Sequence, residues 1–327
     1  MYMAVPRLSD CRERNWSADL AVGRIPVIVG PTAVGKTAVA LSLYRLLPLE
    51  VISADSRQAY RRLDIGTAKP TAKERERVVH HGIDVVDPGT RYSAGRFAKS
   101  APGWIEAARR RGRQPVVVGG TGLYIRALVE GLFVEPPLDP QHRAAIQEWT
   151  DVLDARELIR WANRLDIGFV GGGRQRAVRA IELVLLTGKP LSYWQETARE
   201  VGSVEPWYVV LTVPRQVLHQ RIERRAREMV KRGVIEEVAA VLSEGHAPHA
   251  PGLDGIGMRE AVEYLHGQRS RDSVADAIAT STRRYAKRQE TWFRHQLRGD
   301  LLMLDAVRPP DELAETIATQ WRRTHGE

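Results

Sequence analysis

The chain has 327 residues, of which 43% are hydrophobic and 27% charged, a balance typical of a globular protein with a sizeable core. No apolar run reaches the roughly 18 residues of a membrane span, so we expect no membrane segment, and the first 20 residues lack the apolar stretch of a secretory signal. The single cysteine, Cys11, excludes an internal disulfide framework and fits a cytoplasmic location. The net charge of +9 favours a polyanionic partner.

Strands and helices alternate along the first part of the chain, after an expected flexible tail over residues 1–23. Short apolar runs predict strands, and helical spacing of apolar residues predicts the helices between them. The strands are expected at Ile25–Val29, Glu50–Ser53 and Pro115–Val118, and the helices at Thr37–Leu47, Ala94–Arg111 and Leu123–Gly131. This alternation predicts an α/β fold, a parallel sheet flanked by helices with its ligands at the carboxyl ends of the strands.

The pattern changes after the segment Pro136–Pro140. From Gln141 to Leu186 only helices are expected, broken at Gly168 and at Gly171–Gly173. We therefore predict an all-helical insertion domain over residues 135–189, between two parts of one catalytic core, 24–134 and 190–327. Trp207–Val213 should return to the first sheet as a strand, and the remaining residues should be mostly helical.

A glycine-rich segment between the first strand and the first helix fits the pattern G-x-x-x-x-G-K-[ST] in full. In that context its backbone N–H groups, its lysine and the helix N-terminus favour a phosphate, and its threonine hydroxyl favours Mg²⁺. The expected phosphate ligands are Gly30, Pro31, Thr32, Ala33, Val34, Gly35, Lys36 and Thr37, with Thr37 also expected to hold the Mg²⁺.

This loop predicts a phosphate compound without saying which one. A small-molecule kinase that uses ATP is one interpretation, although the strand Pro115–Val118 ends in Gly-Gly-Thr-Gly instead of an acidic residue. A guanine-reading Asn-Lys-x-Asp motif is absent from the sequence, and so is an obvious lid carrying phosphate-clamping arginines. The ATP interpretation also leaves Arg283–Arg294 unexplained, where cations alternate with aromatics as single-stranded nucleic acid favours.

Six segments carry a more specific signal than the loop alone. They are, in chain order, Ile52–Tyr60, Asp64–Pro70, Gly119–Tyr124, Thr187–Ser192, Leu218–Ile222 and Lys287–Arg294. Together with the loop they resemble the tRNA dimethylallyltransferase (tRNA isopentenyltransferase) family over roughly residues 25 to 300. The resemblance implies transfer of a dimethylallyl group from dimethylallyl diphosphate to N6 of the adenosine 3′ of the anticodon, in tRNAs reading codons that begin with U. It also implies a monomer.

The resemblance implies roles for particular residues. Asp55 matches the family's candidate base, and an aspartate is ionised at neutral pH, so it can accept the amine proton. Thr121 matches a threonine that hydrogen-bonds near the reacting amine, and Arg221 matches an arginine that helps to hold the diphosphate. The positions that match the family's tRNA contacts are Asp55, Ser56, Arg57, Gln58, Thr121, Arg143, Arg176, Arg179, Gly257, Arg259, Lys287, Arg288, Gln289, Trp292 and Arg294.

The sequence departs from the family in parts expected to face tRNA. Gly171–Arg174 stands in place of a Pro-Asn-Asp element, Gly82 in place of leucine, and Met258 in place of an aromatic residue. Asp254 occupies a position where glutamine or a basic residue is usual, and it would repel phosphate unless it is turned away. Two further interpretations remain besides the kinase: prenylation of free adenine nucleotides, and a non-catalytic RNA-binding protein.

Overall fold

The computed structural model describes residues 23–133, 136–198 and 201–325, so all of the expected tail except Gly23 lies outside the described residues, as does Cys11. Its centre is a six-stranded, fully parallel sheet in the order β3-β2-β4-β1-β5-β6. The strands are β1 (Ile25–Val29), β2 (Leu49–Ser53), β3 (His80–His81), β4 (Gln114–Gly119), β5 (Pro206–Thr212) and β6 (Leu301–Asp305). The predicted α/β fold is confirmed.

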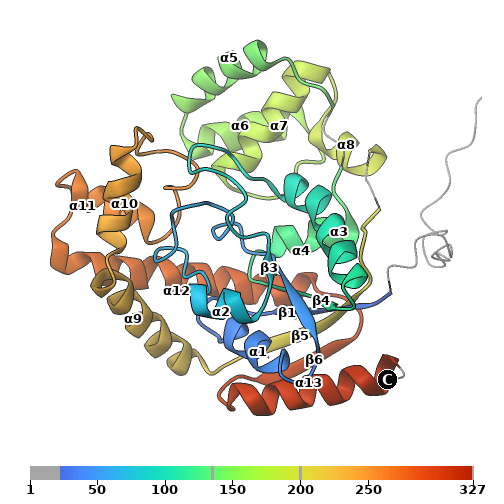
Figure 1. Ribbon diagram of the computed structural model, residues 1–327. Helices are drawn as coiled ribbons and strands as arrows, with labels where there is room; N and C mark the ends of the chain where they lie inside the picture. Colours follow the sequence, from blue (N-terminus) through green and yellow to red (C-terminus); the bar gives the residue numbers. More distant parts are fainter. Residues whose placement is uncertain (1–22, 134–135, 199–200, 326–327) are drawn as a thin grey trace, which may run out of the picture.

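Helices cover both faces of the sheet (Figure 1). Those of the first part of the chain are α1 (Lys36–Leu43), α2 (Ala72–Arg77), α3 (Ala94–Arg110) and α4 (Gly122–Glu130). Those after β5 are α9 (Arg215–Lys231), α10 (Val234–Ser243), α11 (Met258–Leu265), α12 (Arg271–Gln296) and α13 (Pro310–His325).

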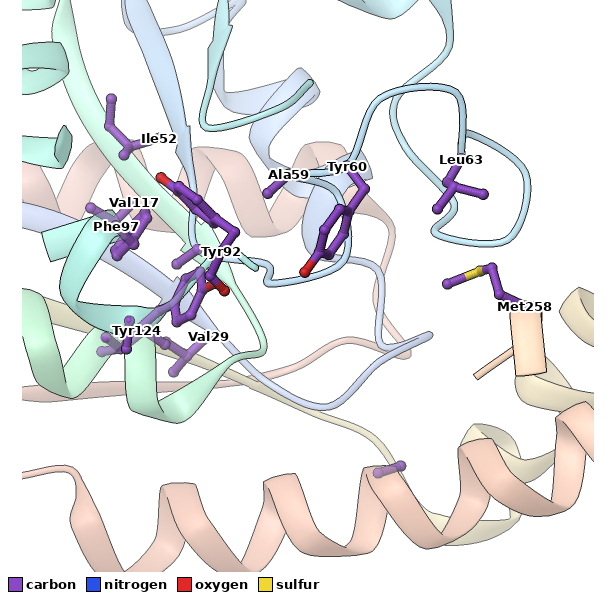
Figure 2. Packing of buried hydrophobic residues seen from close by; sticks show 14 of the residues in the cluster. Val29, Ile52, Ala59, Tyr60, Leu63, Tyr92, Phe97, Val117, Tyr124 and Met258 are labelled. Atoms are coloured by element: carbon purple, nitrogen blue, oxygen red, sulfur yellow. The ribbon is translucent and has the colours of Figure 1, made fainter. Parts of the chain in front are cut away.

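Two apolar cores lie on the two faces of the sheet. Alternate residues of each strand point to opposite faces, so Val27 and Val29 of β1 join one core while Ile28 joins the other. The larger core includes side chains of α3, α4 and α9–α12, and Figure 2 shows Phe97 and Tyr124 packed against sheet residues. The smaller core lies under α1 and α13.

The insertion is helical and has a small core of its own. Its helices are α5 (Pro140–Asp151), α6 (Ala155–Leu165), α7 (Arg174–Thr187) and α8 (Leu191–Thr197), which gather at one end of the molecule (Figure 1). Leu158, Ile181 and Leu191 belong to one buried cluster, and Asp166 accepts hydrogen bonds from the backbone N–H and hydroxyl of Ser192, at 2.9 and 2.6 Å. The helix α8, which follows the expected boundary at Lys189, therefore packs with the insertion.

The structure differs from the sequence prediction at several elements. The first helix ends at Leu43 instead of Leu47, and a further break at 152–154 separates α5 from α6, where Asp154 caps the new helix. The edge strands β3 and β6 were not predicted. Two residues are too few to show a strand pattern, and the four apolar residues Leu301–Leu304 of β6 are too short a run to tell a strand from a helix. Among the described residues no helix is both long and apolar enough to cross a membrane.

Candidate active site

The Gly30–Thr37 loop connects the carboxyl end of β1 to the first turn of α1. Gly30 has a φ of 150° and a Cβ there would lie 2.5 Å from the Leu211 carbonyl oxygen, so only glycine fits. Gly35 has a φ of 113°, which also favours glycine. The Lys36 ammonium turns back over the loop and donates to the carbonyl oxygens of Gly30 and Pro31, both at 2.8 Å. The loop therefore surrounds its own cation.

Asp55 and Thr121 lie beside this loop because β2 and β4 are neighbours that end at the same edge of the sheet. The Arg57 backbone N–H donates to Asp55 Oδ1 at 2.9 Å and fixes the carboxylate. The Thr121 hydroxyl accepts from the Ser56 N–H at 3.1 Å, and the Thr121 N–H donates to the Ala54 carbonyl at 3.2 Å. The neighbouring strands β1, β2 and β4 therefore bring Gly30, Asp55 and Thr121 to one edge of the sheet.

A small cavity of about 40 Å³ joins these segments. Lys36 and Thr37 of α1, Ser53 and Asp55 at the end of β2, and Gly119 at the end of β4 contribute to its lining. Its polar lining includes a cation, a carboxylate and two hydroxyl groups, together with the Gln58 amide and the His80 imidazole. Such a set suits an ionic ligand with oxygen atoms, which the hydroxyls and the ammonium can contact.

Two arginines of α9 approach the loop, one turn apart. Arg221 donates from Nη1 to the Val34 carbonyl and from Nη2 to the Ala306 carbonyl, both at 2.9 Å, so it supports the loop backbone from behind. Arg225 lies nearer to Asp55: its Nη1 is 3.5 Å from the Thr32 hydroxyl, and it interacts electrostatically with the Asp55 carboxylate. Sequence reasoning assigned Arg221 and passed over Arg225, although their spacing of four residues puts both on one face of a helix.

Charges within the site act on one another. Loss of water around the Lys36 ammonium lowers its pKa to about 8, an effect opposed by the Asp55 carboxylate and increased by Arg225. Burial also lowers the pKa of Arg225, and Asp55 opposes this. One carboxylate therefore faces two cations, an excess of positive charge that an anionic ligand would neutralise.

The helix α12 forms one wall of the site with its buried face. The buried side chain of Gln289 accepts from the Thr32 N–H at 2.8 Å and donates to the Gly120 carbonyl at 2.7 Å, so it ties the Gly30–Thr37 loop to the β4–α4 connection. Trp292 packs against Gly122, where a Cβ would lie 2.4 Å from the indole. Gln289, one of the predicted tRNA contacts, therefore makes its side-chain hydrogen bonds within the protein.

The opposite face of α12 carries exposed cations. Lys287, Arg288 and Arg294 are all exposed, and the Arg288 guanidinium lies 5.6 Å from the centre of the Tyr285 ring. Arg259, also exposed, is the second residue of α11, whose N-cap Gly257 has a φ of 93° that favours glycine. Burial raises the pKa of Tyr285, which interacts with both Asp55 and Thr121.

The segment after Asp55 is held by the C-terminal part of the chain. Arg57 donates to the Asp254 carboxylate and, at 3.1 Å, to the Pro251 carbonyl. Asp254 is therefore paired with a cation, which answers the expected repulsion of phosphate. The Gln58 side chain accepts from the Ser53 hydroxyl at 2.9 Å and donates to the Ala68 carbonyl at 3.3 Å.

The insertion holds three of the predicted tRNA contacts, and they differ in exposure. Arg143 and Arg179 both pair with Glu182, at 3.4 and 3.0 Å, and only 2% of Glu182 is exposed. Arg176 is exposed on the first turn of α7. Glu182 was missed from the sequence, where its place between Ile181 and Leu183 gives no sign that it is buried between arginines.

Family models and individual known relatives place the chain in the same family. The family model described as IPP transferase matches residues 58–296, and that described as isopentenyl transferase matches residues 23–81. A tRNA dimethylallyltransferase of Syntrophobacter fumaroxidans is 42% identical over 275 residues, which cover 83% of this chain and 80% of that protein. One of Geobacter metallireducens is 41% identical over 280 residues, covering 83% and 89%. These matches confirm the resemblance drawn from the motifs.

Solved structures agree with the sequence relatives. The full-length tRNA isopentenylpyrophosphate transferase of Bacillus halodurans superposes with a TM-score of 0.67 at 33% identity, covering 92% of this chain and 96% of that one. A eukaryotic dimethylallyltransferase acting on tRNA superposes with a TM-score of 0.74 at 26% identity, covering 92% and 80%.

Proposed function

Since the chain belongs to the IPP transferase family, we propose that it transfers the dimethylallyl group of dimethylallyl diphosphate to N6 of the adenosine 3′ of the anticodon, in tRNAs that read codons beginning with U. The observation that carries the proposal is the placement of one carboxylate, Asp55, beside a cationic loop: Lys36 and Arg225 both interact with it. A base and a leaving-group site are thus adjacent. A tRNA substrate would place the protein in the cytoplasm, and we propose that it acts as a monomer.

The acceptor amine needs a base because its lone pair is delocalised into the purine. In the proposed step the N6 nitrogen forms a bond to the allylic carbon while the carbon–oxygen bond to the diphosphate breaks. The amine proton passes to the Asp55 carboxylate, which the Arg57 N–H holds in place. Thr121, held by the Ser56 N–H, contacts the same amine. The adenine reaches the site by leaving its stack, which an unpaired loop permits at low cost.

The leaving diphosphate gains negative charge as the bond breaks. The loop residues Gly30, Pro31, Thr32, Ala33, Val34, Gly35, Lys36 and Thr37 would receive it, with Arg225 beside Thr32. These donors stabilise the departing anion more than the bound donor, which is the condition for acceleration. Arg221 holds the loop backbone through the Val34 carbonyl and so supports this geometry from behind.

A magnesium ion fits the chemistry of this lining. The hydroxyl of Thr37, the expected ligand, and that of Ser53 line one cavity, and oxygen atoms are the ligands that Mg²⁺ prefers. Among the described residues no group of three or more His, Cys, Asp or Glu is placed to hold a metal, so most ligands would come from the diphosphate and water. When bound, the ion would neutralise part of the diphosphate charge.

The exposed cations of α12 provide a place for the tRNA backbone. We propose that Lys287, Arg288 and Arg294 contact phosphates, together with Arg259 and Arg176. Gln289 and Trp292 act differently, since they support the loops that carry the chemistry. Arg143 and Arg179 of the insertion are proposed to contact the tRNA while both remain paired with Glu182.

A transfer assay tests the proposal against the kinase alternative. Purified protein with Mg²⁺, unmodified tRNA and dimethylallyl diphosphate carrying a labelled allyl group should place label in acid-precipitable RNA. ATP in place of that donor should give no transfer, and tRNA should stimulate no ATP hydrolysis. Release of phosphate from ATP, with no label in the RNA, would favour the kinase.

The charge of Lys36 predicts a pH dependence for donor use. Because its pKa is lowered to about 8, the free enzyme loses this cation above that pH. The kcat/KM for dimethylallyl diphosphate should therefore fall by about tenfold between pH 7 and pH 9. The kcat/KM for tRNA, measured at saturating donor, is the internal control and should change less. A donor profile that stays flat to pH 9 contradicts the assignment.

Replacing two exposed cations of α12 should weaken tRNA binding without touching the chemistry. Lys287→Ala with Arg288→Ala should raise the Kd for tRNA and reduce the slope of log K against log salt by roughly 1 to 2. Filter-binding titrations at several salt concentrations measure this, with the donor KM as control. An unchanged slope would show that neither side chain neutralises a phosphate.

A further inference from the structure

The motif Asp64–Pro70 is one of the six specific segments of the sequence, and it lies outside the Gly30–Thr37 loop. It forms a compact loop between β2 and α2, closed by hydrogen bonds from the Lys69 N–H to the Asp64 carbonyl at 3.0 Å and from the Ala68 N–H to the Ile65 carbonyl at 3.1 Å. Its contacts include α10, α11, Asp84 and the segment that follows Asp55. We call residues 60–70 the brace loop.

One carboxylate of α10 holds the tip of the brace loop. Glu237 Oε2 accepts from the backbone N–H groups of Asp64 and Ile65 at 2.6 and 2.7 Å, and its Oε1 accepts from the Gly66 N–H at 2.9 Å. Three consecutive N–H groups that point at one anion form a strong, directional site. The two carboxylate oxygens of Glu237 accept from all three N–H groups, and the negative charge strengthens each bond.

A buried cation holds the base of the same loop. The Lys69 ammonium, whose side chain is only 1% exposed, donates to the Tyr60 carbonyl at 2.6 Å and pairs with Asp64 at 2.6 Å and Asp84 at 2.7 Å. A buried ammonium with three oxygen partners is a satisfied group, so its role is to close the loop and not to react. The brace loop is thus fixed at both ends.

The brace loop contacts both the segment that follows Asp55 and the turn at Gly257, which is predicted to face tRNA. On one side Gln58, three residues after Asp55, donates to the Ala68 carbonyl at 3.3 Å, and Gln58 and Pro70 line the cavity with Asp55. On the other side a Cβ on Gly66 would lie 2.4 Å from the Met258 sulfur and one on Gly257 3.3 Å from the Gly66 carbonyl oxygen. Figure 2 shows Met258 facing the Leu63 turn of the brace loop.

We propose that Glu237 is a positioning residue for the transfer reaction: it clamps the brace loop and thereby holds the segment Asp55–Gln58 in its reactive position. The inference rests on the proposed function for the step that is measured. Glu237 touches neither the Gly30–Thr37 loop nor the exposed face of α12, so its loss should act on the chemical step and leave donor binding unchanged.

The test compares Glu237→Gln with Glu236→Gln, its neighbour on the same helix. Glu236 is exposed and pairs with Arg271 at 2.9 Å, away from the brace loop, so it is a matched control for charge and helix stability. In Glu237→Gln, kcat should fall by about 10- to 100-fold, as small displacements of a reactive group cause. The KM for dimethylallyl diphosphate should stay within about twofold, since uniform binding is untouched. Glu236→Gln should match the unchanged protein.

Hydrogen exchange gives a readout that does not depend on turnover. The amides of Asp64, Ile65 and Gly66 should exchange faster in Glu237→Gln, and so should those of residues 56–58. Glu237→Asp keeps the charge but is shorter, so both kcat and protection should recover in part. A kcat equal to that of Glu236→Gln, or a loss that appears only in the donor KM, overturns the proposal.

Two other outcomes are also decisive. Should Glu237→Gln be too unstable to assay, Glu237→Asp replaces it, and faster exchange at the three amides with unchanged kcat contradicts the proposal. If the unchanged protein transfers no label to tRNA, the proposed function fails by itself. The clamp is then judged by exchange alone, and unaltered exchange at residues 56–58 in the variants refutes the coupling to Asp55.

Discussion

Replacing Asp55 by asparagine should reduce kcat by roughly 10²- to 10⁴-fold, the range that a general base contributes. Asparagine keeps the shape and can still accept from the Arg57 N–H, which now fixes the carboxylate at 2.9 Å. It cannot take the proton from the N6 amine. Single-turnover transfer of a labelled allyl group to tRNA measures the loss directly.

Binding measurements separate this loss from a general failure of the site. Since Asp55 lies between Lys36 and Arg225, removing its charge leaves these two cations less neutralised, and diphosphate affinity should hold or increase at a pH low enough to keep Lys36 protonated, because loss of the carboxylate lowers the Lys36 pKa further. The Kd for tRNA, which depends on exposed cations elsewhere, should change little. An asparagine variant with near-normal single-turnover rate would remove Asp55 from the mechanism.

Replacing Arg225 by glutamine should lower kcat by about 10²- to 10³-fold, the usual loss when one preorganised donor to a developing anion is removed. Its Nη1 lies 3.5 Å from the Thr32 hydroxyl, on the side of the loop that faces Asp55. Glutamine retains hydrogen-bonding ability but no charge. Steady-state kinetics with varied donor should show the loss mainly in kcat.

The neighbouring arginines provide the controls for this variant. Arg224 is exposed on the same helix, so Arg224→Gln should leave kcat unchanged. Arg221 supports the loop through the Val34 and Ala306 carbonyls, so Arg221→Gln should raise the donor KM and lower thermal stability as well. If Arg221→Gln and Arg225→Gln have the same kinetic profile, the distinction between a supporting and a contacting arginine is wrong.

Much of the fold could be predicted from the sequence because its central strands are buried on both faces. The continuous apolar runs of β1 and β4 and the glycine loop are local signals that survive folding. The edge strand β6 has only the four-residue apolar run Leu301–Leu304, which is too short to tell a strand from a helix, and its pairing with β5 defines it as a strand. Helix ends such as Leu43 also depend on tertiary packing.

The candidate site was less predictable where the role of a side chain depends on a contact with a residue far away in the sequence. Motifs led to Asp55 and Thr121, which the sheet brings together. Arg221 and Arg225 lie on the same face of α9, so the sequence could not show which of them contacts the loop backbone and which lies near Asp55. Nor could it show that Gln289 bridges Thr32 and Gly120, 257 and 169 residues away.

The nucleoside composition of tRNA after reaction shows whether the dimethylallyl group is transferred and to which adenosine. Unmodified tRNA that reads a codon beginning with U is incubated with the protein, Mg²⁺ and dimethylallyl diphosphate, digested, and analysed by mass spectrometry. We predict adenosine carrying one dimethylallyl group at N6, located only at the position 3′ of the anticodon and missing when that adenosine is replaced by guanosine. Several such tRNAs that remain unmodified by active, folded protein would contradict the proposed function.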